Sequence, residues 1–298
     1  MNINLELYKI FREVAKSGNI SKAAERLFVS QSAVSQAIIQ LENKIGGKLF
    51  DRSVHGVKLT VEGDVLFSHI NDAILLIENA QTKFAEMKEL NSGSIKIGAS
   101  DTICSIFLLP VLEKFNNKHP NIRISVTNRI TQESIELLKH AAVDIAFVNL
   151  PVAKDSSLDI TPVKTIHDCF VVGGQYEFLA DKTMNLSDLK KYPILTLEKA
   201  SNSRKQMDLF MEGKGIEIQP AIELGSLALL SGFAKIGLGI ASTIKEEAQD
   251  MLDRHELREL KFYEELPKRH IGLVKIKNVN LSFAAKAFIE EMTQKTER

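Results

Sequence analysis

The chain has 298 residues, of which 44% are hydrophobic, and its 38 basic side chains balance 38 acidic ones. This length corresponds to two or three domains of about 100–200 residues each. No stretch approaches the roughly 18 apolar residues of a membrane helix, so we expect a cytoplasmic protein without membrane contact. Two cysteines exclude a disulfide framework. Short motifs of metalloproteases, serine hydrolases and phosphate-binding loops are absent, so we expect no enzyme, no metal and no cofactor.

Charge is divided unevenly along the chain. Residues 1–60 contain nine Lys or Arg and five Asp or Glu, a net charge of +4, which leaves −4 for the remainder. Phosphate groups attract a basic segment, whereas a weakly acidic one stays away from nucleic acid. This modest excess supports nucleic-acid binding by the first sixty residues only if a binding motif also lies there.

Residues 21–36 have the pattern of two short helices joined by a tight turn. Ala23 and Ala24 allow the helices to cross closely, and Val34 recurs with later apolar residues at helical spacing. Ser21 and Ser30 stand where N-caps are expected, so we expect both helices to begin there. Spacing alone is equally compatible with an ordinary two-helix hairpin.

The second helix has a polar face, which favours a role in base recognition. Glutamine can pair with adenine through two hydrogen bonds, and serine can donate or accept at any base edge. A short β-wing follows from Asp51 to Thr60, and its basic side chains are suited to phosphates or the minor groove. The predicted DNA contacts are Ser30, Gln31, Ser32, Ser35 and Gln36 of the helix with Arg52 and His55 of the wing.

Residues 4–64 resemble the N-terminal domain of LysR-type transcriptional regulators. The positions that carry the resemblance are Phe11, Val14, Ala15, Ser21, Ala23, Ala24, Leu27, Ser30, Gln31, Ser32, Val34, Ser35, Leu41, Glu42, Gly46, Leu49, Phe50, Arg52, Leu59, Thr60 and Gly63. Gln36 and His55 stand where relatives often carry a basic residue. The preference of relatives for particular half-sites therefore does not transfer to this chain.

A long linker helix is predicted from residue 61 to residue 90. Its apolar residues step by four and three, the pattern of two helices wound around each other. A dimer presents two recognition helices and prefers an inverted repeat in double-stranded DNA. The predicted dimer contacts are Leu66, Ile70, Ala73, Ile77, Ala80 and Phe84.

Strands and helices alternate beyond residue 91, which predicts parallel sheets with helical crossovers. The resemblance implies a periplasmic-binding-protein-like effector domain over residues 91–298. Lobe I would comprise residues 94–163 and 269–298, and lobe II residues 164–268. The predicted fold class is thus α/β multidomain: a winged helix-turn-helix (1–60), a dimerising linker helix (61–90) and a two-lobed effector domain.

Polar residues follow the predicted strands at the ends where ligands bind in such sheets. Short hydroxyl groups and exposed main-chain N–H groups favour a small polar ligand, anionic or, because of Asp101, zwitterionic. The same residues are equally common as N-caps. The predicted effector contacts are Ser100, Asp101, Thr102, Asn128, Asn149, Ser201, Asn202, Ser203 and Arg204.

The sequence therefore predicts a DNA-binding transcriptional regulator controlled by a small effector. The resemblance also implies contact with RNA polymerase and a tetramer of two dimers. One alternative is a cytoplasmic solute-binding protein whose N-terminal helices serve assembly, although assembly would favour apolar residues where Gln31 and Ser35 stand. Another alternative is a redox-sensing regulator that uses Cys104 and Cys169.

Overall fold

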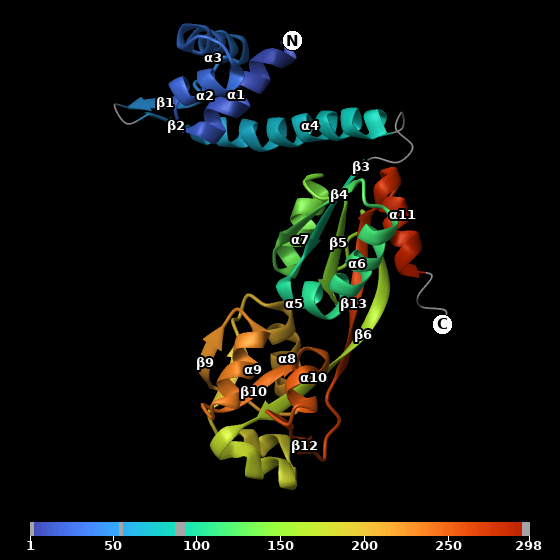
Figure 1. Cartoon of the computed structure of the whole chain (residues 1–298). Coiled ribbons are helices and arrows are strands. Elements are labelled where there is room, and N and C mark those ends of the chain that lie inside the picture. The colour runs from blue at the N-terminus through green and yellow to red at the C-terminus, as the bar shows by residue number, and fades with distance from the viewer. Residues whose placement is uncertain (1–2, 54–55, 87–92, 294–298) are drawn as a thin grey trace. The chain divides into compact units, whose positions relative to one another are not determined.

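The computed structural model describes residues 3–53, 56–86 and 93–293 of the chain. The chain forms two compact units, Met1–Phe84 and Ala85–Arg298, and each is described by itself (Figure 1). The fold class predicted from the sequence is confirmed: a winged helix-turn-helix and a long helix precede a two-lobed α/β domain.

The first unit packs three helices around one apolar core. Its elements are α1 (Leu5–Ser17), α2 (Ile20–Leu27), α3 (Gln31–Ile45), β1 (Phe50–Ser53), β2 (Gly56–Leu59) and α4 (Val61–Glu86). Phe11, Val14, Val34 and Leu41 are each fully buried. The apolar spacing read from the sequence therefore identifies the inner face of α1 and α3.

The starts of α2 and α3 differ in how they are capped. Ser30 caps α3 as predicted, since its hydroxyl accepts the N–H of Ala33 at 3.2 Å. The prediction for Ser21 was wrong: Asn19 caps α2, and its carboxamide accepts the N–H groups of Ser21 and Lys22. Asparagine is as good an N-cap as serine, so sequence alone did not separate two neighbouring candidates.

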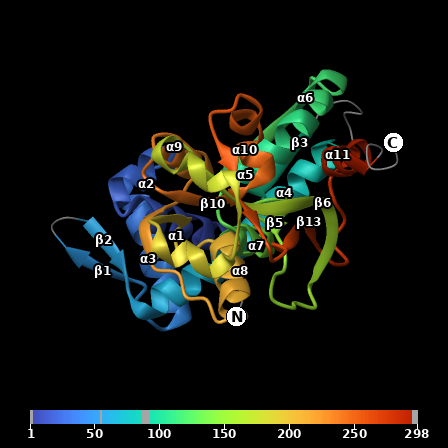
Figure 2. The ribbon, with the colours of Figure 1, turned by 90° about the horizontal axis from the view of Figure 1, so that it is seen from below.

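The wing is an antiparallel hairpin that projects beyond the three helices (Figure 2). The buried carboxylate of Glu42 in α3 holds its base by accepting the N–H of Leu49 at 2.8 Å. At Gly63, in the first turn of α4, a Cβ atom would lie 2.2 Å from the Leu49 carbonyl oxygen. Only glycine permits this close approach of α4 to the wing.

The helix α4 is attached to the rest of the first unit by apolar contacts and, further along, by polar ones. Leu66, Phe67 and Ile70 pack against the core of the first unit. Arg12 of α1 then donates to Asn71 at 3.0 Å and to Glu78 at 2.7 Å, which fixes a further length of α4 along α1. The two helices are therefore joined by both apolar and polar contacts.

Lobe I of the second unit has a sheet with helices on its faces. Its elements are β3 (Gly93–Ala99), α5 (Asp101–Ile103), a π-helical turn (Cys104–Leu108), α6 (Leu109–Lys118), β4 (Ile122–Asn128), α7 (Thr131–Lys139), β5 (Ile145–Asn149) and α11 (Phe283–Thr293). Strand β3 pairs in parallel with both β4 and β5, as the alternation predicted.

Lobe II repeats this plan with additional short elements. These are two 3₁₀ helices (Gly174–Asp181 and Leu186–Lys191), β7 (Thr183–Met184), β8 (Ile194–Leu197), α8 (Asn202–Glu212), β9 (Pro220–Leu224), α9 (Leu227–Lys235), β10 (Ile240–Ile244), α10 (Lys245–Asp253), β11 (Arg258–Glu259) and β12 (Lys261–Phe262). Strand β8 pairs in parallel with β9 and β10. The sequence did not predict β10, because the segment that precedes it, Gly237-Leu238-Gly239, reads as a turn.

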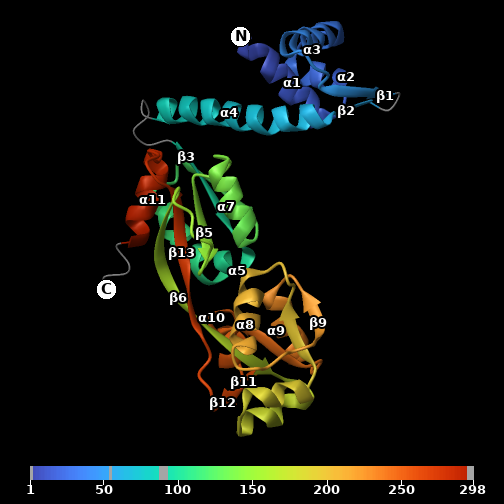
Figure 3. The same cartoon turned by 180° about the vertical axis from the view of Figure 1, so that it is seen from behind.

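Two antiparallel strands, β6 (Leu158–Val172) and β13 (Lys268–Ile276), carry the chain between the lobes (Figure 3). The first part of β6 pairs with β13, and its last residues pair with β10 of lobe II. The apolar run from Cys169 to Gly173 predicts a strand, but β6 begins already at Leu158. A strand shared by two sheets has no single buried face along its length. The polar middle of β6 therefore breaks the alternation of apolar and polar residues by which a strand is recognised in a sequence. We call the segments 164–168 and 268–271 the hinge.

Candidate functional site

The N-terminal half of α3 has an exposed polar face, and its opposite face is buried. Ser30, Gln31, Ser32 and Gln36 are exposed and Ser35 is half-buried. The hydroxyl groups of Ser30 and Ser32 lie 3.0 Å apart, so this pair is already engaged in organising the helix start. The amides of Gln31 and Gln36 have no hydrogen-bond partner in the described part of the chain. They are therefore free for a base edge.

The wing contains two predicted DNA contacts, and one of them lies in the described part of the chain. Arg52 lies in β1 opposite Val57 of β2. His55 lies outside the described residues. Lys58 of β2 is exposed and adds a cation to the same hairpin. The wing thus adds basic side chains to the first unit, on a hairpin that follows the C-terminal end of α3.

The six predicted dimer contacts fall into two groups along α4. Leu66 and Ile70 are half-buried against the core of their own unit. Ala73, Ile77 and Ala80 are exposed, as is Phe84 at 65%. Only the second half of the seam is open to another chain.

A cavity of about 250 Å³ lies between the two lobes of the second unit. Lobe I contributes the N-terminus of α7 and the segment after β5, and lobe II contributes the first turns of α8. Its lining residues are Thr131, Gln132, Pro151, Val152, Ala153, Ala200, Asn202, Lys205 and Gln206. Lys205 is the one charged residue among them, so the cavity has a positive bias.

The structure brings Asn149 and Asn202 together beside this cavity. The carboxamide of Asn202 donates to the Asn149 carbonyl oxygen at 2.7 Å and to that of Pro151 at 3.3 Å. The side-chain oxygen of Asn149 is buried and has no hydrogen-bond partner among the described residues. Asn149 does not itself line the cavity, and Asn202 connects it to that space.

Four other predicted effector residues stand apart from the cavity. Ser100 caps α5 through a 3.4 Å hydrogen bond from the N–H of Ile103. Asp101 and Thr102 form the first turn of α5, and Asn128 is exposed at the end of β4. They mark the ends of lobe I strands, but none of them lines the 250 Å³ space.

The last residues of the predicted set lie at the start of α8. Ser201 occupies the N-cap position without making a side-chain cap bond. Arg204 turns into lobe II, where it donates to Thr196 at 2.6 Å and pairs with Asp208 and Glu223. Burial acts to lower the pKa of Arg204, and these two carboxylates outweigh it and raise the pKa. Its guanidinium therefore joins α8 to β8 and β9 rather than facing the cavity.

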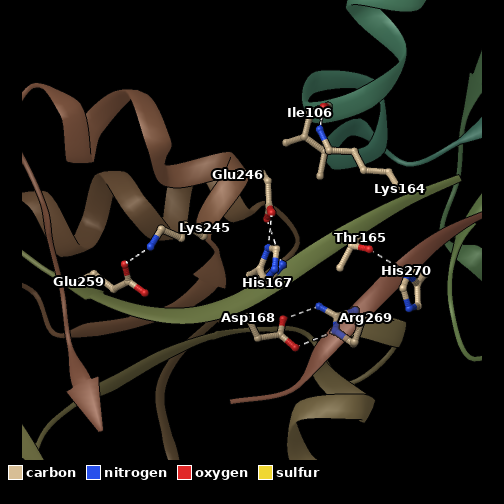
Figure 4. Close-up of polar contacts among 10 residues, drawn as sticks. All are labelled: Ile106, Lys164, Thr165, His167, Asp168, Lys245, Glu246, Glu259, Arg269 and His270. Carbon is tan, nitrogen blue, oxygen red and sulfur yellow. Dashed lines mark hydrogen bonds and ion pairs between the residues drawn. The ribbon is translucent and has the colours of Figure 1, made fainter. Parts of the chain in front are cut away.

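Sequence reasoning missed an ion pair at the hinge. Arg269 of β13 and Asp168 of β6 are both buried and joined by two hydrogen bonds, one of them 2.7 Å from Nε to Oδ2 (Figure 4). Arg269 also donates to the hydroxyl of Ser203 in α8 at 3.2 Å. A charged residue inside an apolar returning strand was the available signal, because buried arginines are almost always paired.

Further polar contacts attach the hinge to both lobes (Figure 4). Lys164 donates to the carbonyl oxygen of Ile106 in lobe I at 2.7 Å. His167 lies 2.7 Å from Glu246 in α10 of lobe II. Burial acts to raise the pKa of Glu246, and the hydrogen bonds with His167 outweigh it and lower the pKa. The hinge is therefore held by specific contacts on each side.

The two cysteines are poorly suited to redox sensing. Cys104 is half-buried and Cys169 is buried. Burial raises the pKa of both thiols, which keeps them protonated and weakly nucleophilic.

The described residues contain no cluster of side chains that could hold a metal ion. Their helices include none with the length and apolar content to cross a membrane.

Comparisons with known proteins agree with this architecture. Residues 5–64 match the family described as bacterial regulatory helix-turn-helix protein, lysR family, and residues 88–297 match the LysR substrate binding domain. The chain is 27% identical to the transcriptional regulator GltR of Bacillus subtilis over 241 residues, covering 80% of this chain and 79% of that protein. It is also 27% identical to a probable RuBisCO transcriptional regulator of Cyanidioschyzon merolae, covering 97% of each chain.

Solved structures show the same fold over the full length. CbnR, a LysR family transcriptional regulator, aligns with a TM-score of 0.72 at 18% identity, covering 98% of this chain and 99% of that one. CbnR complexed with its target DNA aligns with a TM-score of 0.74 at 17% identity, with the same coverage.

A winged helix-turn-helix followed by a two-lobed α/β domain with an interlobe cavity defines a transcriptional regulator with an effector-binding domain. The matched families together account for nearly the whole length of the chain. The chain belongs to the LysR family of bacterial transcriptional regulators, and its relatives are regulators rather than enzymes.

Proposed function

We propose that the chain binds duplex DNA as a dimer at an interrupted inverted repeat, through α3 in the major groove and the wing on the flanking backbone. The observation that carries this proposal is the exposed polar end of α3 set on a fully buried back. Gln31, Ser32, Ser35 and Gln36 are the proposed base contacts. Arg52 and His55 are proposed to reach phosphates or the minor groove.

A titration tests the proposed base contacts. The double variant Gln31→Ala/Gln36→Ala should lose affinity for a specific fragment yet keep its binding to unrelated DNA and the slope of binding against salt. Base contacts specify sequence, whereas phosphate contacts set the salt dependence. The matched control, Lys58→Ala, should instead lower that slope. Equal loss on specific and unrelated DNA in the double variant would remove the two glutamines from base recognition.

The proposed effector is a small polar molecule, anionic or zwitterionic, held between the lobes. Three features support this class: the 250 Å³ volume, Lys205 in the lining, and the N-terminus of α8 without a side-chain cap. Helix N-termini stabilise negative charge. Ser100, Asp101, Thr102 and Asn128 remain proposed contacts at the strand ends of lobe I, outside the lining of this cavity, and Asp101 is suited to an amine.

Regulation is proposed to proceed by a shift between two lobe arrangements. A ligand that binds one arrangement more tightly moves the population toward it. In a tetramer of two dimers this changes the spacing of the DNA-bound units, and RNA polymerase is recruited or excluded.

Thermal denaturation with candidate ligands tests the effector class. A ligand that binds only the folded chain raises its melting temperature in proportion to RT ln(1 + [L]/Kd). Small carboxylates, amino acids and inorganic oxyanions should include a compound that stabilises the chain and loses its effect in Lys205→Ala. Stabilisation only by apolar or cationic compounds would contradict the proposed class.

A further inference from the structure

The first residue of α8 joins the two lobes directly. Asn202 belongs to lobe II, and its carboxamide donates to the main-chain oxygens of Asn149 and Pro151 at the end of β5 in lobe I. The α8 N-cap, Ser201, forms no side-chain cap bond. The Asn202 amide is thus committed to the opposite lobe rather than to the start of its own helix.

The second residue of α8 is joined to the hinge. The hydroxyl of Ser203 accepts from Arg269 at 3.2 Å, and Arg269 is held by Asp168 on the neighbouring crossing strand. All three side chains are buried, with 9% of Ser203, 5% of Arg269 and 8% of Asp168 exposed. Solvent therefore does not compete for these contacts, and a displacement of α8 acts on both strands that connect the lobes.

We propose that Asn202 is a clasp that holds the lobes together without effector, and that its release reaches the hinge through Ser203, Arg269 and Asp168. Asn202 lines the interlobe cavity, so a ligand there contacts the clasp itself. A ligand that takes over the Asn202 amide frees the two lobe I carbonyl groups. This inference rests on the proposed effector control, since the clasp is the part of the site that ligand binding changes.

The variant Asn202→Asp opens the clasp with little disturbance to α8. It preserves side-chain size and removes the donor, and its carboxylate faces two carbonyl oxygens. Negative charge at the first residue of a helix is favourable, so α8 should stay folded. Asn202→Ala removes the donor without adding charge and guards against an effect of charge alone. Asn121→Asp, in the exposed turn before β4, is the matched control.

Hydrogen exchange of the full chain, without DNA or effector, measures the result. In both Asn202 variants, exchange should accelerate roughly two- to tenfold at residues 145–152 and in the hinge, the change expected from losing a hydrogen bond. Residues 11–14 in the first unit should be unaffected, and so should every segment in Asn121→Asp. Unchanged exchange at residues 145–152 in both variants would overturn the clasp.

The proposed path from Asn202 to the hinge is tested in the variant Ser203→Ala. There, Asn202→Asp should still accelerate exchange at residues 145–152 but add nothing in the hinge. An undiminished hinge response would show that release does not travel through Ser203. Because no ligand or DNA is present, failure of the clasp leaves the proposed function standing. Failure of the ligand screen, in turn, does not alter the exchange result.

Discussion

Glu42 shows how a single buried charge fixes the geometry of the DNA-binding unit. Burial acts to raise the pKa of its carboxyl group, but the hydrogen bond from the Leu49 N–H and the nearby Lys48 ammonium lower it below its ordinary value of 4.5. This carboxylate joins the end of α3 to the start of the wing. It therefore fixes the wing to the C-terminal half of the helix whose N-terminal half carries the proposed base contacts.

Glu42→Gln should lower the free energy of unfolding of the first unit at pH 7 by about 1–3 kcal/mol, since an amide replaces a hydrogen-bonded buried carboxylate. A lowered folded-state pKa gives stability that is present above the unfolded-state pKa and lost as pH falls through the folded-state pKa. The difference between variant and wild type should therefore shrink below about pH 4. Hydrogen exchange of amides in α1 and α3 reports this energy, with exposed Glu25→Gln as control. A pH-independent difference would contradict the assignment.

Ser35→Ala should weaken specific DNA binding by about 1–3 kcal/mol if its hydroxyl contacts a base. Binding to unrelated sequences should stay as in wild type, because phosphate contacts are unaffected. Fluorescence anisotropy with specific and scrambled duplexes at one salt concentration measures both affinities. Ser68→Ala on α4 is the control, and equal weakening on both duplexes would refute the base contact.

The role of a residue was predictable from the sequence where its neighbours along the chain decide that role. It was not predictable where contacts with distant residues decide it. The cap at Ser30 belongs to a short local motif, so it could be recognised, whereas the close approach of Gly63 to the Leu49 carbonyl oxygen could not. Arg204 was expected to face a ligand because it follows a strand. Its two acidic partners in lobe II come from positions that no local pattern connects to it.

At the scale of elements, α4 carries two roles on different parts of its surface. Its first half covers the core of its own unit, while Ala73, Ile77 and Ala80 remain exposed. Periodicity identified the seam but could not separate these halves, because both obey the same spacing.

Ile77→Glu should convert dimers to monomers, because a charge in an apolar helix pair is desolvated without a partner. Light scattering coupled to size-exclusion chromatography measures the mass. Ser68→Glu, on the opposite face of α4, should leave the mass unchanged. A dimeric Ile77→Glu variant would show that association depends on another surface.

At the scale of the whole molecule, the sequence predicted both lobes and the return of the chain to lobe I. It did not predict β10 or the length of β6, and β6 is one of the two strands that connect the lobes. A strand such as β6, which passes from one sheet to another, is specified by partners far along the chain. Asp168, one partner in the proposed coupling, lies in the part of β6 that the sequence did not predict.

Selection of genomic DNA fragments by the purified chain at physiological salt, followed by sequencing, measures whether the chain recognises a specific DNA sequence. One interrupted inverted repeat should be enriched, with half-sites one helical turn or a multiple of it apart. Retention of fragments without sequence preference, lost as salt rises, would contradict specific recognition. Such a result would leave only a basic N-terminal unit that binds phosphate backbones.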